Sequence, residues 1–222
     1  MVFTSCTALL AAHQWELSAI HRRTTGRLPH WDLSGATYAI TFRLADSVPQ
    51  KLLAAWERER AALESKAQRE NGILLESERE KLATLRGQRI QHWLDQGCGE
   101  CVLRQPDFAD LMQNTLLYFD GQRYDLLAWC VMPNHVHVVV RPFEGETIST
   151  MLKSWKGFSA RQINKARGKT GEFWMRESFD RVVRNRRHLR DAVAYVMDNP
   201  KMGGLRNWRW CGVADGAEAL WE

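Results

Sequence analysis

The chain has 222 residues, 45% of them hydrophobic and 26% charged, and a formal net charge of +5, as in an ordinary globular protein with one ample core. Its longest apolar run, residues 126–132, is far too short to cross a bilayer, so we expect no membrane span. The ALLAA stretch near the amino terminus has no preceding Lys or Arg, so we expect no signal peptide. A cytoplasmic protein is the expectation. Five scattered cysteines, an odd number, argue against a secreted disulfide framework, and the CxxC at Cys98 and Cys101 has no second pair that would complete a zinc site.

The first 35 residues show no sustained periodicity and are predicted to form an irregular basic arm with room for a short helix. The basic side chains of this arm are Arg22, Arg23 and Arg27. The stretch ATYAITFRL at 36–44 is rich in β-branched and aromatic residues and is predicted to be a strand.

A helical pattern runs from Lys51 to Gln96 and is interrupted by Asn-Gly at 71–72. Ser77 followed by Glu80 fits a capping box near the start of the second helix. We therefore expect a charged antiparallel helix pair that is inserted after the first strand and occupies residues 50–105.

The middle of the chain predicts a helix followed by a hairpin. Residues 106–119 have the spacing of an amphipathic helix that covers a sheet. Two strands, YDLLAWCVM at 124–132 and HVHVVVR at 135–141, are joined by Pro133-Asn134, a pair suited to the centre of a type I turn. An antiparallel pairing of these strands is the expectation.

The last third of the chain predicts two further helices. Residues 148–164 have an apolar side that includes Trp155 and Phe158, residues 171–183 are extended or looped, and RHLRDAVAYVMDN forms a helix that Pro200 stops. A tail of residues 205–222 completes a single domain that spans residues 1–222. This order of elements indicates an α+β fold, an antiparallel sheet with helices packed on it.

His135 and His137 stand out in their valine-rich strand, because a buried imidazole must find a hydrogen-bond or metal partner. Side chains alternate along a strand, so both histidines share one face with Val139, while the intervening valines point to the other face. Two imidazoles placed in this way can bind one metal ion. They can equally form a structural pair that is hydrogen-bonded to neighbours or solvent.

On the last helix, His188, Asp191, Tyr195 and Asn199 fall along one edge, with Tyr195 and Asn199 one turn apart. A tyrosine that faces a metal-bound phosphate can act as a nucleophile, and Asn199 offers a further ligand. The alternatives are an amphipathic residue at the margin of the core for Tyr195 and a helix terminus before Pro200 for Asn199.

Basic residues concentrate in the carboxy-terminal part of the chain. Residues 141–210 contain 16 Lys and Arg against 7 Asp and Glu, whereas residues 36–140 contain 12 against 14. This surface either binds a polyanion or is a solvated basic face without a partner. The candidate contacts are Lys153, Lys156, Arg184, Arg186 and Arg187. Trp155, Trp174, Trp208 and Trp210 interleave with the basic residues and are candidates either for base stacking or for the core.

Taken together, several stretches resemble a known family. MPNHVHVVV is similar to the histidine-hydrophobe-histidine strand of the single-tyrosine HUH transposases. FWMRESFDRVVRN and LRDAVAYVMDNPKMGGL resemble the tyrosine-helix region of the REP-associated tyrosine transposases (RAYT), and PHW at 29–31 and TYAITFRLADSVP at 37–49 resemble the amino-terminal segment of that subgroup. The chain departs from the subgroup in NPKMGGL at 199–205, where NPVKAGL is usual, and at Met175, where a polar residue is common. Neither departure removes a catalytic group.

The resemblance implies a ferredoxin-like palm of antiparallel strands with helices on one side. It also implies that His135, His137 and Asn199 bind Mg²⁺ or Mn²⁺ and that Tyr195 is the nucleophile. The implied enzyme is a metal-dependent tyrosine transposase that cleaves and rejoins single-stranded DNA through a 5′-phosphotyrosine intermediate.

The implied partner is single-stranded DNA that folds into hairpins, the repetitive extragenic palindromes, and the arm with Arg22, Arg23 and Arg27 is a candidate to grip it. We expect a monomer or homodimer associated with the nucleoid. Two alternatives stay open: a regulator that binds DNA hairpins without cutting them, and a metal-dependent phosphodiesterase that uses water. The intact set of two histidines, Tyr195 and Asn199 favours the transposase.

Overall fold

The computed structural model describes residues 21–25, 28–32, 35–69, 89–94 and 96–215. Its centre is a five-stranded antiparallel sheet in the order β6-β3-β5-β4-β7. The bounds of these strands are Phe179–Val183 for β6, Thr37–Arg43 for β3, His135–Pro142 for β5, Tyr124–Val131 for β4 and Cys211–Val213 for β7. The predicted α+β class, the strand at 36–44 and the hairpin of β4 and β5 are confirmed.

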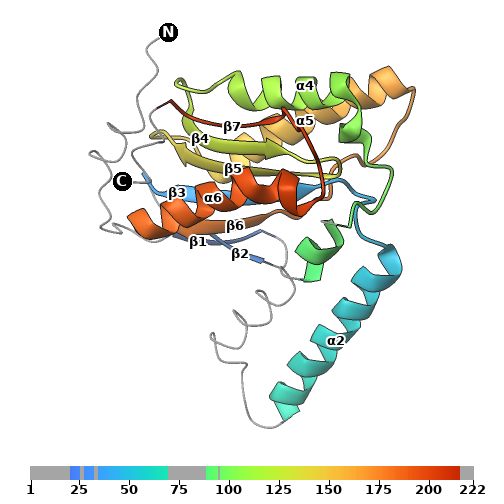
Figure 1. The fold of residues 1–222 in the computed structure, drawn as a ribbon. Coiled ribbons are helices and arrows are strands. Elements are labelled where there is room, and N and C mark those ends of the chain that lie inside the picture. Colours follow the sequence, from blue (N-terminus) through green and yellow to red (C-terminus); the bar gives the residue numbers. More distant parts are fainter. Residues whose placement is uncertain (1–20, 26–27, 33–34, 70–88, 95, 216–222) are drawn as a thin grey trace.

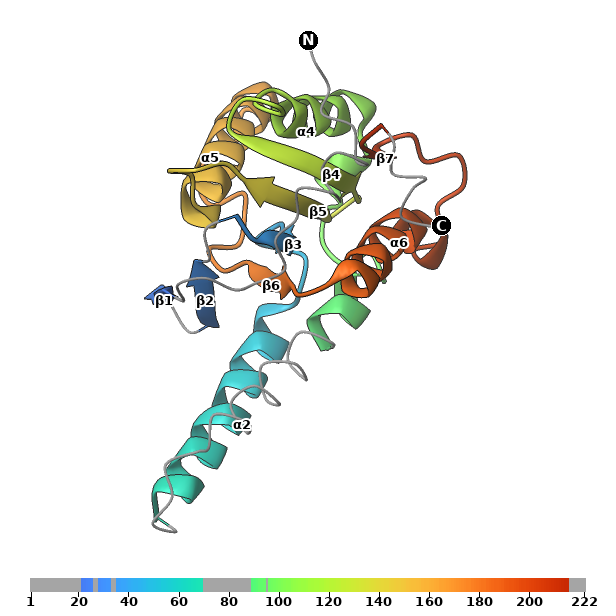
Figure 2. The same ribbon diagram turned by 90° about the vertical axis from the view of Figure 1, so that its left-hand side faces the viewer.

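Helices cover both faces of this sheet (Figures 1 and 2). On one face lie α4 (Pro106–Leu117) and α5 (Ile148–Arg167), and on the other lies α6 (Arg186–Met202). Strand β3, helix α4, the β4–β5 hairpin, helix α5 and strand β6 follow one another as in the ferredoxin-like fold. The expectation of helices on one side holds for α4 and α5 but not for α6, whose apolar stripe of Leu189, Val193 and Val196 packs on the opposite face.

Side chains along β5 point alternately to the two faces of the sheet, as predicted, and so belong to different cores. Val136, Val138 and Val140 belong to the large core under α4 and α5. Val139 belongs to the smaller core under α6. Because His135 and His137 share the face of Val139, they lie on the α6 side of the sheet.

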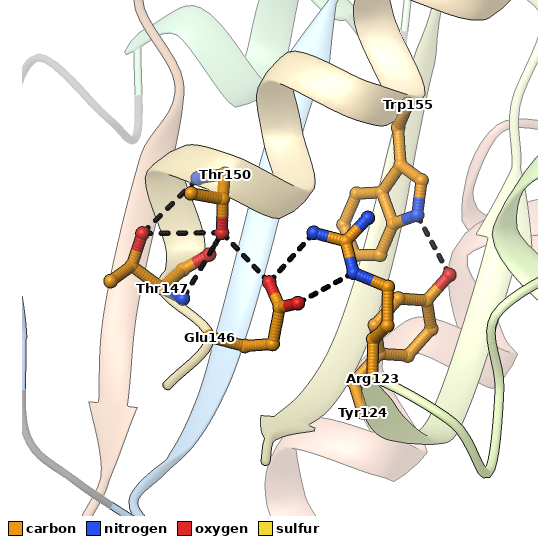
Figure 3. A network of polar contacts seen from close by, with 6 residues as sticks. All are labelled: Arg123, Tyr124, Glu146, Thr147, Thr150 and Trp155. Carbon is orange, nitrogen blue, oxygen red and sulfur yellow. Dashed lines mark hydrogen bonds and ion pairs between the residues drawn. The ribbon is translucent and has the colours of Figure 1, made fainter. Parts of the chain in front are cut away.

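A polar network fixes the start of α5 against β4 (Figure 3). Arg123 forms a bidentate ion pair with Glu146, at 2.6 and 2.7 Å, and Glu146 also accepts a hydrogen bond from Thr150 in the first turn of the helix. One turn further along, Trp155 Nε1 donates to the hydroxyl of Tyr124 at 2.9 Å. Both aromatic side chains are 1% exposed, so this polar contact is buried inside the core.

The helical insertion leaves the sheet after β3. Helix α2 (Gln50–Arg69) projects away from the sheet (Figure 2), and residues 89–94 are helical as well. A small apolar cluster that includes Leu53 and Leu94 joins these two helical parts at their base. Glu59 and Arg89 form an ion pair across them at 2.7 Å. The Asn-Gly break and the capping box at Ser77 and Glu80 lie outside the described residues.

Several local predictions need correction. The strands β1 (His21–Thr25) and β2 (Leu28–Asp32) pair with each other and lie next to β6, where an irregular arm was expected (Figure 1). Phe158 is 44% exposed, although its spacing placed it on the buried side of α5. Within the described ranges, no helix combines the length and the apolar content that a bilayer crossing requires.

Helix α6 passes through Pro200 and ends at Met202, although the proline was expected to stop it. Proline removes only one intrahelical bond here, and the last turn is closed by the amides of Gly203 and Leu205, which donate to the carbonyls of Asn199 and Pro200 at 2.9 and 2.7 Å. Asn199 therefore lies inside the helix, and the reading of it as a plain helix terminus is wrong.

Candidate active site

The two histidines of β5 face each other in the interior. His135 is fully buried and His137 is 2% exposed, and their Nε2 atoms lie 2.9 Å apart. At that distance one imidazole donates and the other accepts, so the pair satisfies itself in this state. A metal-binding pair requires this proximity, and a structural pair hydrogen-bonded to its neighbours is compatible with it.

The outer nitrogens of both imidazoles also have partners. His135 Nδ1 lies 2.7 Å from Asn134 Oδ1, and His137 Nδ1 lies 2.8 Å from the hydroxyl of Thr41 on β3. An amide oxygen only accepts, so Nδ1 of His135 carries the hydrogen and its Nε2 presents a lone pair. A hydroxyl can donate or accept, so Thr41 supports either tautomer of His137. Both lone pairs on the inner nitrogens can therefore face a metal ion at once.

Helix α6 brings Tyr195 and Asn199 to the histidine pair, and the two residues lie one turn apart on the helix, as their four-residue spacing predicted. The rings of Tyr195 and His137 meet edge to face with centroids 5.4 Å apart, and Tyr195 remains 38% exposed. Asn199 is fully buried and its Nδ2 donates to the carbonyl of Tyr195 at 2.6 Å. His135, His137, Tyr195 and Asn199 thus lie together on the face of the sheet that α6 covers.

Burial determines the charge of the pair. It lowers the pKa of His137 to about 3 and the pKa of His135 well below its ordinary value, because an imidazolium ion cannot be solvated there. The nearby Asn199 side chain opposes this effect and raises the pKa of both groups. At neutral pH both imidazoles are neutral, which is the form that binds a metal.

The amide oxygen of Asn199 supplies a test of whether a metal ion fits. This Oδ1 atom is buried and forms no hydrogen bond of regular geometry within the part of the chain that the structure describes. An unpaired buried acceptor costs about 1–3 kcal/mol. An unsatisfied oxygen beside two imidazole lone pairs is a donor set of two nitrogens and one oxygen, which suits a divalent ion with open positions. The residues present therefore fit the expected group.

No group of three or more His, Cys, Asp or Glu side chains arranged for a metal ion occurs among the described residues. Cys98 and Cys101 of the CxxC are both free thiols. Cys101 Sγ donates to the carbonyl of Gly97 at 3.1 Å instead. Among the described residues, the amide oxygen of Asn199 is therefore the candidate third ligand for an ion held by His135 and His137.

The basic candidates are distributed over the surface in different ways. Arg184, Arg186 and Arg187 are exposed around the amino terminus of α6, and Lys153 is exposed on α5. Lys156, another of the candidate contacts, folds back onto the protein. Its Nζ donates to the carbonyls of residues 175 and 176 at 3.0 and 3.3 Å, and burial lowers its pKa to about 8. The long side chain folds onto the loop before β6, where the two carbonyls replace water.

The amino-terminal arginines and the tryptophans are the remaining candidates for contacts with a nucleic acid. Arg22 and Arg23 belong to β1, and Arg27 lies outside the described residues. The four tryptophans proposed as stacking platforms divide as follows: Trp155, Trp174 and Trp210 are buried, and Trp208 is half-buried. The buried three serve the core, and Trp208 donates its Nε1 to a carbonyl of β4 at 2.8 Å.

Thr41 and Asn134 were not predicted as parts of the site. Thr41 lies opposite His137 in the β3–β5 register, a relation that appears only once the strands are paired. Asn134 was interpreted as a turn residue, and its position directly before His135 was the one available signal. Both residues act on the outer nitrogens of the histidines.

The fold and the site together define an α+β protein with a buried histidine pair and a helix-borne tyrosine on one face of an antiparallel sheet. Residues 105–199 match the family model described as "Transposase IS200 like", and this segment contains His135, His137, Tyr195 and Asn199. The predicted resemblance to the transposases is thus confirmed over that segment.

Several solved structures are similar to the chain, among them two transposase structures. One is described as a REP-associated tyrosine transposase bound to a REP hairpin, with 16% identity, a TM-score of 0.44, and coverage of 80% of this chain and 76% of that chain. The other is described as a candidate transposase from Deinococcus radiodurans R1, with 17% identity, a TM-score of 0.38, and coverage of 73% and 88%. No curated protein matches the chain.

Proposed function

We propose that the protein is a transposase-like enzyme that cleaves and rejoins single-stranded, hairpin-forming DNA through Tyr195, with His135, His137 and Asn199 as ligands of Mg²⁺ or Mn²⁺. The observation that carries this proposal is the contact of a partly exposed phenol with a buried imidazole pair beside an unsatisfied amide oxygen. A purely structural histidine pair would need neither the tyrosine nor the orphaned oxygen.

The distribution of tyrosines supports Tyr195 as the nucleophile. The chain has four tyrosines, of which Tyr38 and Tyr124 are 1% exposed, Tyr118 is 70% exposed and Tyr195 is 38% exposed. A nucleophile must reach a phosphate, so the two buried phenols are excluded. Tyr118 follows α4 on the opposite face of the sheet, which leaves Tyr195 as the tyrosine that both meets solvent and contacts the histidines.

The arginines around α6 support a polyanionic substrate. Arg186 and Arg187 occupy the first turn of α6, Arg184 precedes its cap, and the first turn contains no acidic residue. Cations at the amino terminus of a helix are unfavourable because the helix dipole is positive there. Such an arrangement is stabilised when a phosphate backbone neutralises the side chains and the exposed amides together.

In the proposed reaction, the Tyr195 oxygen attacks the phosphorus of a DNA phosphodiester. The new bond joins phosphorus to the phenol oxygen, the bond to the 3′ oxygen breaks, and the phenol proton ends on the released 3′-hydroxyl. Rejoining is the reverse attack of a 3′-hydroxyl, which returns the proton to the phenol. A bound divalent ion would polarise the phosphate and offset the charge that develops on its oxygens. His135, His137 and Asn199 would hold that ion.

The test uses a pool of single-stranded hairpin oligonucleotides with randomised flanks, labelled at the 3′ end, and Mn²⁺. The fragment that carries the 5′ phosphate keeps the 3′ label, so a covalent adduct appears as labelled protein on a denaturing gel. We expect the adduct with the wild type and with Tyr118→Phe, which removes an exposed phenol elsewhere, and no adduct with Tyr195→Phe.

The other outcomes identify the alternatives. Cleavage without an adduct, undiminished in Tyr195→Phe, would mean that water is the nucleophile. Retention of the hairpins without cleavage or adduct would mean a binding protein. Either result overturns the proposal.

A further inference from the structure

The turn between β4 and β5 connects the histidine strand to the helical insertion. Asn134, in this turn, is 1% exposed and uses both ends of its side-chain amide. Its Nδ2 donates to the carbonyls of Leu94 and Cys98 at 3.3 and 2.9 Å, and its Oδ1 lies 2.7 Å from His135 Nδ1. One side chain thus links the end of the insertion to the first histidine.

The main chain around the turn is held by the same surroundings. The amide of Leu103 donates to the carbonyl of Pro133 at 3.0 Å, and the amide of Leu44 donates to the carbonyl of Asn134 at 2.9 Å. Residues 44 and 103 lie just before and just after the two helical parts of the insertion. The turn is therefore held between the segment that enters the insertion and the segment that leaves it.

The base of the insertion is anchored independently of the active site. Val48, Leu53 and Leu94 form a buried cluster separate from the two cores of the sheet, and all three are at most 5% exposed. Leu94 lies in the helical stretch 89–94, and its carbonyl accepts from the backbone amide of Gly97 at 3.0 Å. Asn134 Nδ2 donates to this carbonyl as well as to that of Cys98, so the packing of the insertion decides where the acceptors of Asn134 are.

These contacts fix the orientation of the Asn134 amide. Two backbone carbonyls can only accept, so they must face the NH₂ group, and the amide oxygen must face His135. An oxygen in that position requires the hydrogen of His135 on Nδ1, since the other tautomer would set two lone pairs against each other 2.7 Å apart. The lone pair of His135 is thereby placed on Nε2, on the side of His137.

We propose that the helical insertion fixes the tautomer and orientation of His135 through Asn134, which is a positioning residue of the metal site. Hydrogen bonds to the outer nitrogen of a metal-binding histidine commonly change metal affinity 10- to 100-fold. The link to metal binding rests on the proposed function, whereas the tautomer itself does not.

The first test needs no variant and no DNA. A long-range ¹H–¹⁵N correlation spectrum of the metal-free wild type at neutral pH reads which ring nitrogen of each histidine carries the hydrogen. We expect His135 to be protonated on Nδ1. A spectrum with the hydrogen of His135 on Nε2 overturns the proposal, whatever the DNA assay shows.

The second test compares Asn134→Ala with Thr41→Val, which removes the partner of His137 but leaves the insertion contacts intact. In Asn134→Ala we expect His135 to populate both tautomers and the Kd for Mn²⁺, measured by titration calorimetry, to rise about 10- to 100-fold. In Thr41→Val the tautomer of His135 should be unchanged. An unchanged His135 tautomer and an Mn²⁺ Kd within twofold of the wild type in Asn134→Ala would refute the role of Asn134.

A loss of DNA cleavage alone cannot mimic these results, because neither readout involves DNA. If the wild type shows the predicted tautomer and Mn²⁺ affinity but forms no DNA adduct, the proposed function fails and the positioning role of Asn134 stands.

Discussion

Acid should destabilise the metal-free protein through its buried histidines, and His137 allows the magnitude to be estimated. Burial lowers the pKa of this imidazole to about 3 in the folded protein, whereas the pKa in the unfolded chain is about 6.5. Between these two values the unfolded chain binds a proton that the folded protein does not, so the free energy of unfolding falls as the pH falls.

The expected loss between pH 7 and pH 5 is about 2 kcal/mol from His137 alone, since each pH unit below 6.5 contributes about 1.4 kcal/mol. His135 contributes in the same direction, because burial also lowers its pKa. Above pH 7 both groups are neutral in both states, and this contribution to the pH dependence disappears. Against a typical stability of 5–15 kcal/mol, the effect is large enough to measure.

The assay is urea unfolding followed by tryptophan fluorescence, in the presence of a chelator, at pH 5, 6 and 7. His137→Gln removes the titrating group, so its loss of stability between pH 7 and pH 5 should be smaller than that of the wild type by about 2 kcal/mol. Tyr195→Phe keeps both histidines and should retain the wild-type dependence. An identical pH dependence in His137→Gln and the wild type would refute the inference that His137 is buried in its neutral form.

Three further substitutions have expected outcomes. Tyr124→Phe leaves the buried Nε1 of Trp155 without its acceptor and should lower the free energy of unfolding by about 1–3 kcal/mol in the same urea assay. Gly212→Ala places a Cβ atom 2.4 Å from the ring of Trp129. Thermal unfolding should show a free energy of unfolding that is lower by about 1–3 kcal/mol because of overpacking. Unchanged stability would mean that the ring moves freely. Asn199→Asp replaces a neutral ligand oxygen by an anionic one and should tighten Mn²⁺ binding in titration calorimetry, while weaker or equal binding would remove Asn199 from the ligand set.

The placement of the candidate site residues within their own elements could be predicted from the sequence, because each placement depends on local periodicity. A strand repeats every two residues, so His135 and His137 had to share a face, and a helix repeats every 3.6 residues, so Tyr195 and Asn199 had to be neighbours. The contact between the two histidines and these two helix residues could not be derived from periodicity. It depends on α6 packing on the face opposite α4 and α5, whereas the resemblance implied a palm with helices on one side.

The features that the sequence did not reveal depend on distant partners. Strand β7 has three residues and owes its conformation to pairing with β4, so it carries no periodic signal of its own. Thr41 looks like any β-branched strand residue until the register places it beside His137. Asn134 has the composition of a turn residue, and its partners Leu94 and Cys98 are about 40 positions away. Tertiary hydrogen bonds of this kind are not encoded in local patterns.

The most direct test of the account locates the covalent bond in the adduct. After nuclease treatment and tryptic digestion, the peptide of residues 191–201, DAVAYVMDNPK, contains Tyr195 as its only tyrosine. After incubation with hairpin DNA and Mn²⁺, we expect mass spectrometry to find a 5′-phosphonucleotide on Tyr195 of this peptide. A nucleotide on the peptide that contains Tyr118, or the absence of any nucleotide-modified peptide, would contradict it.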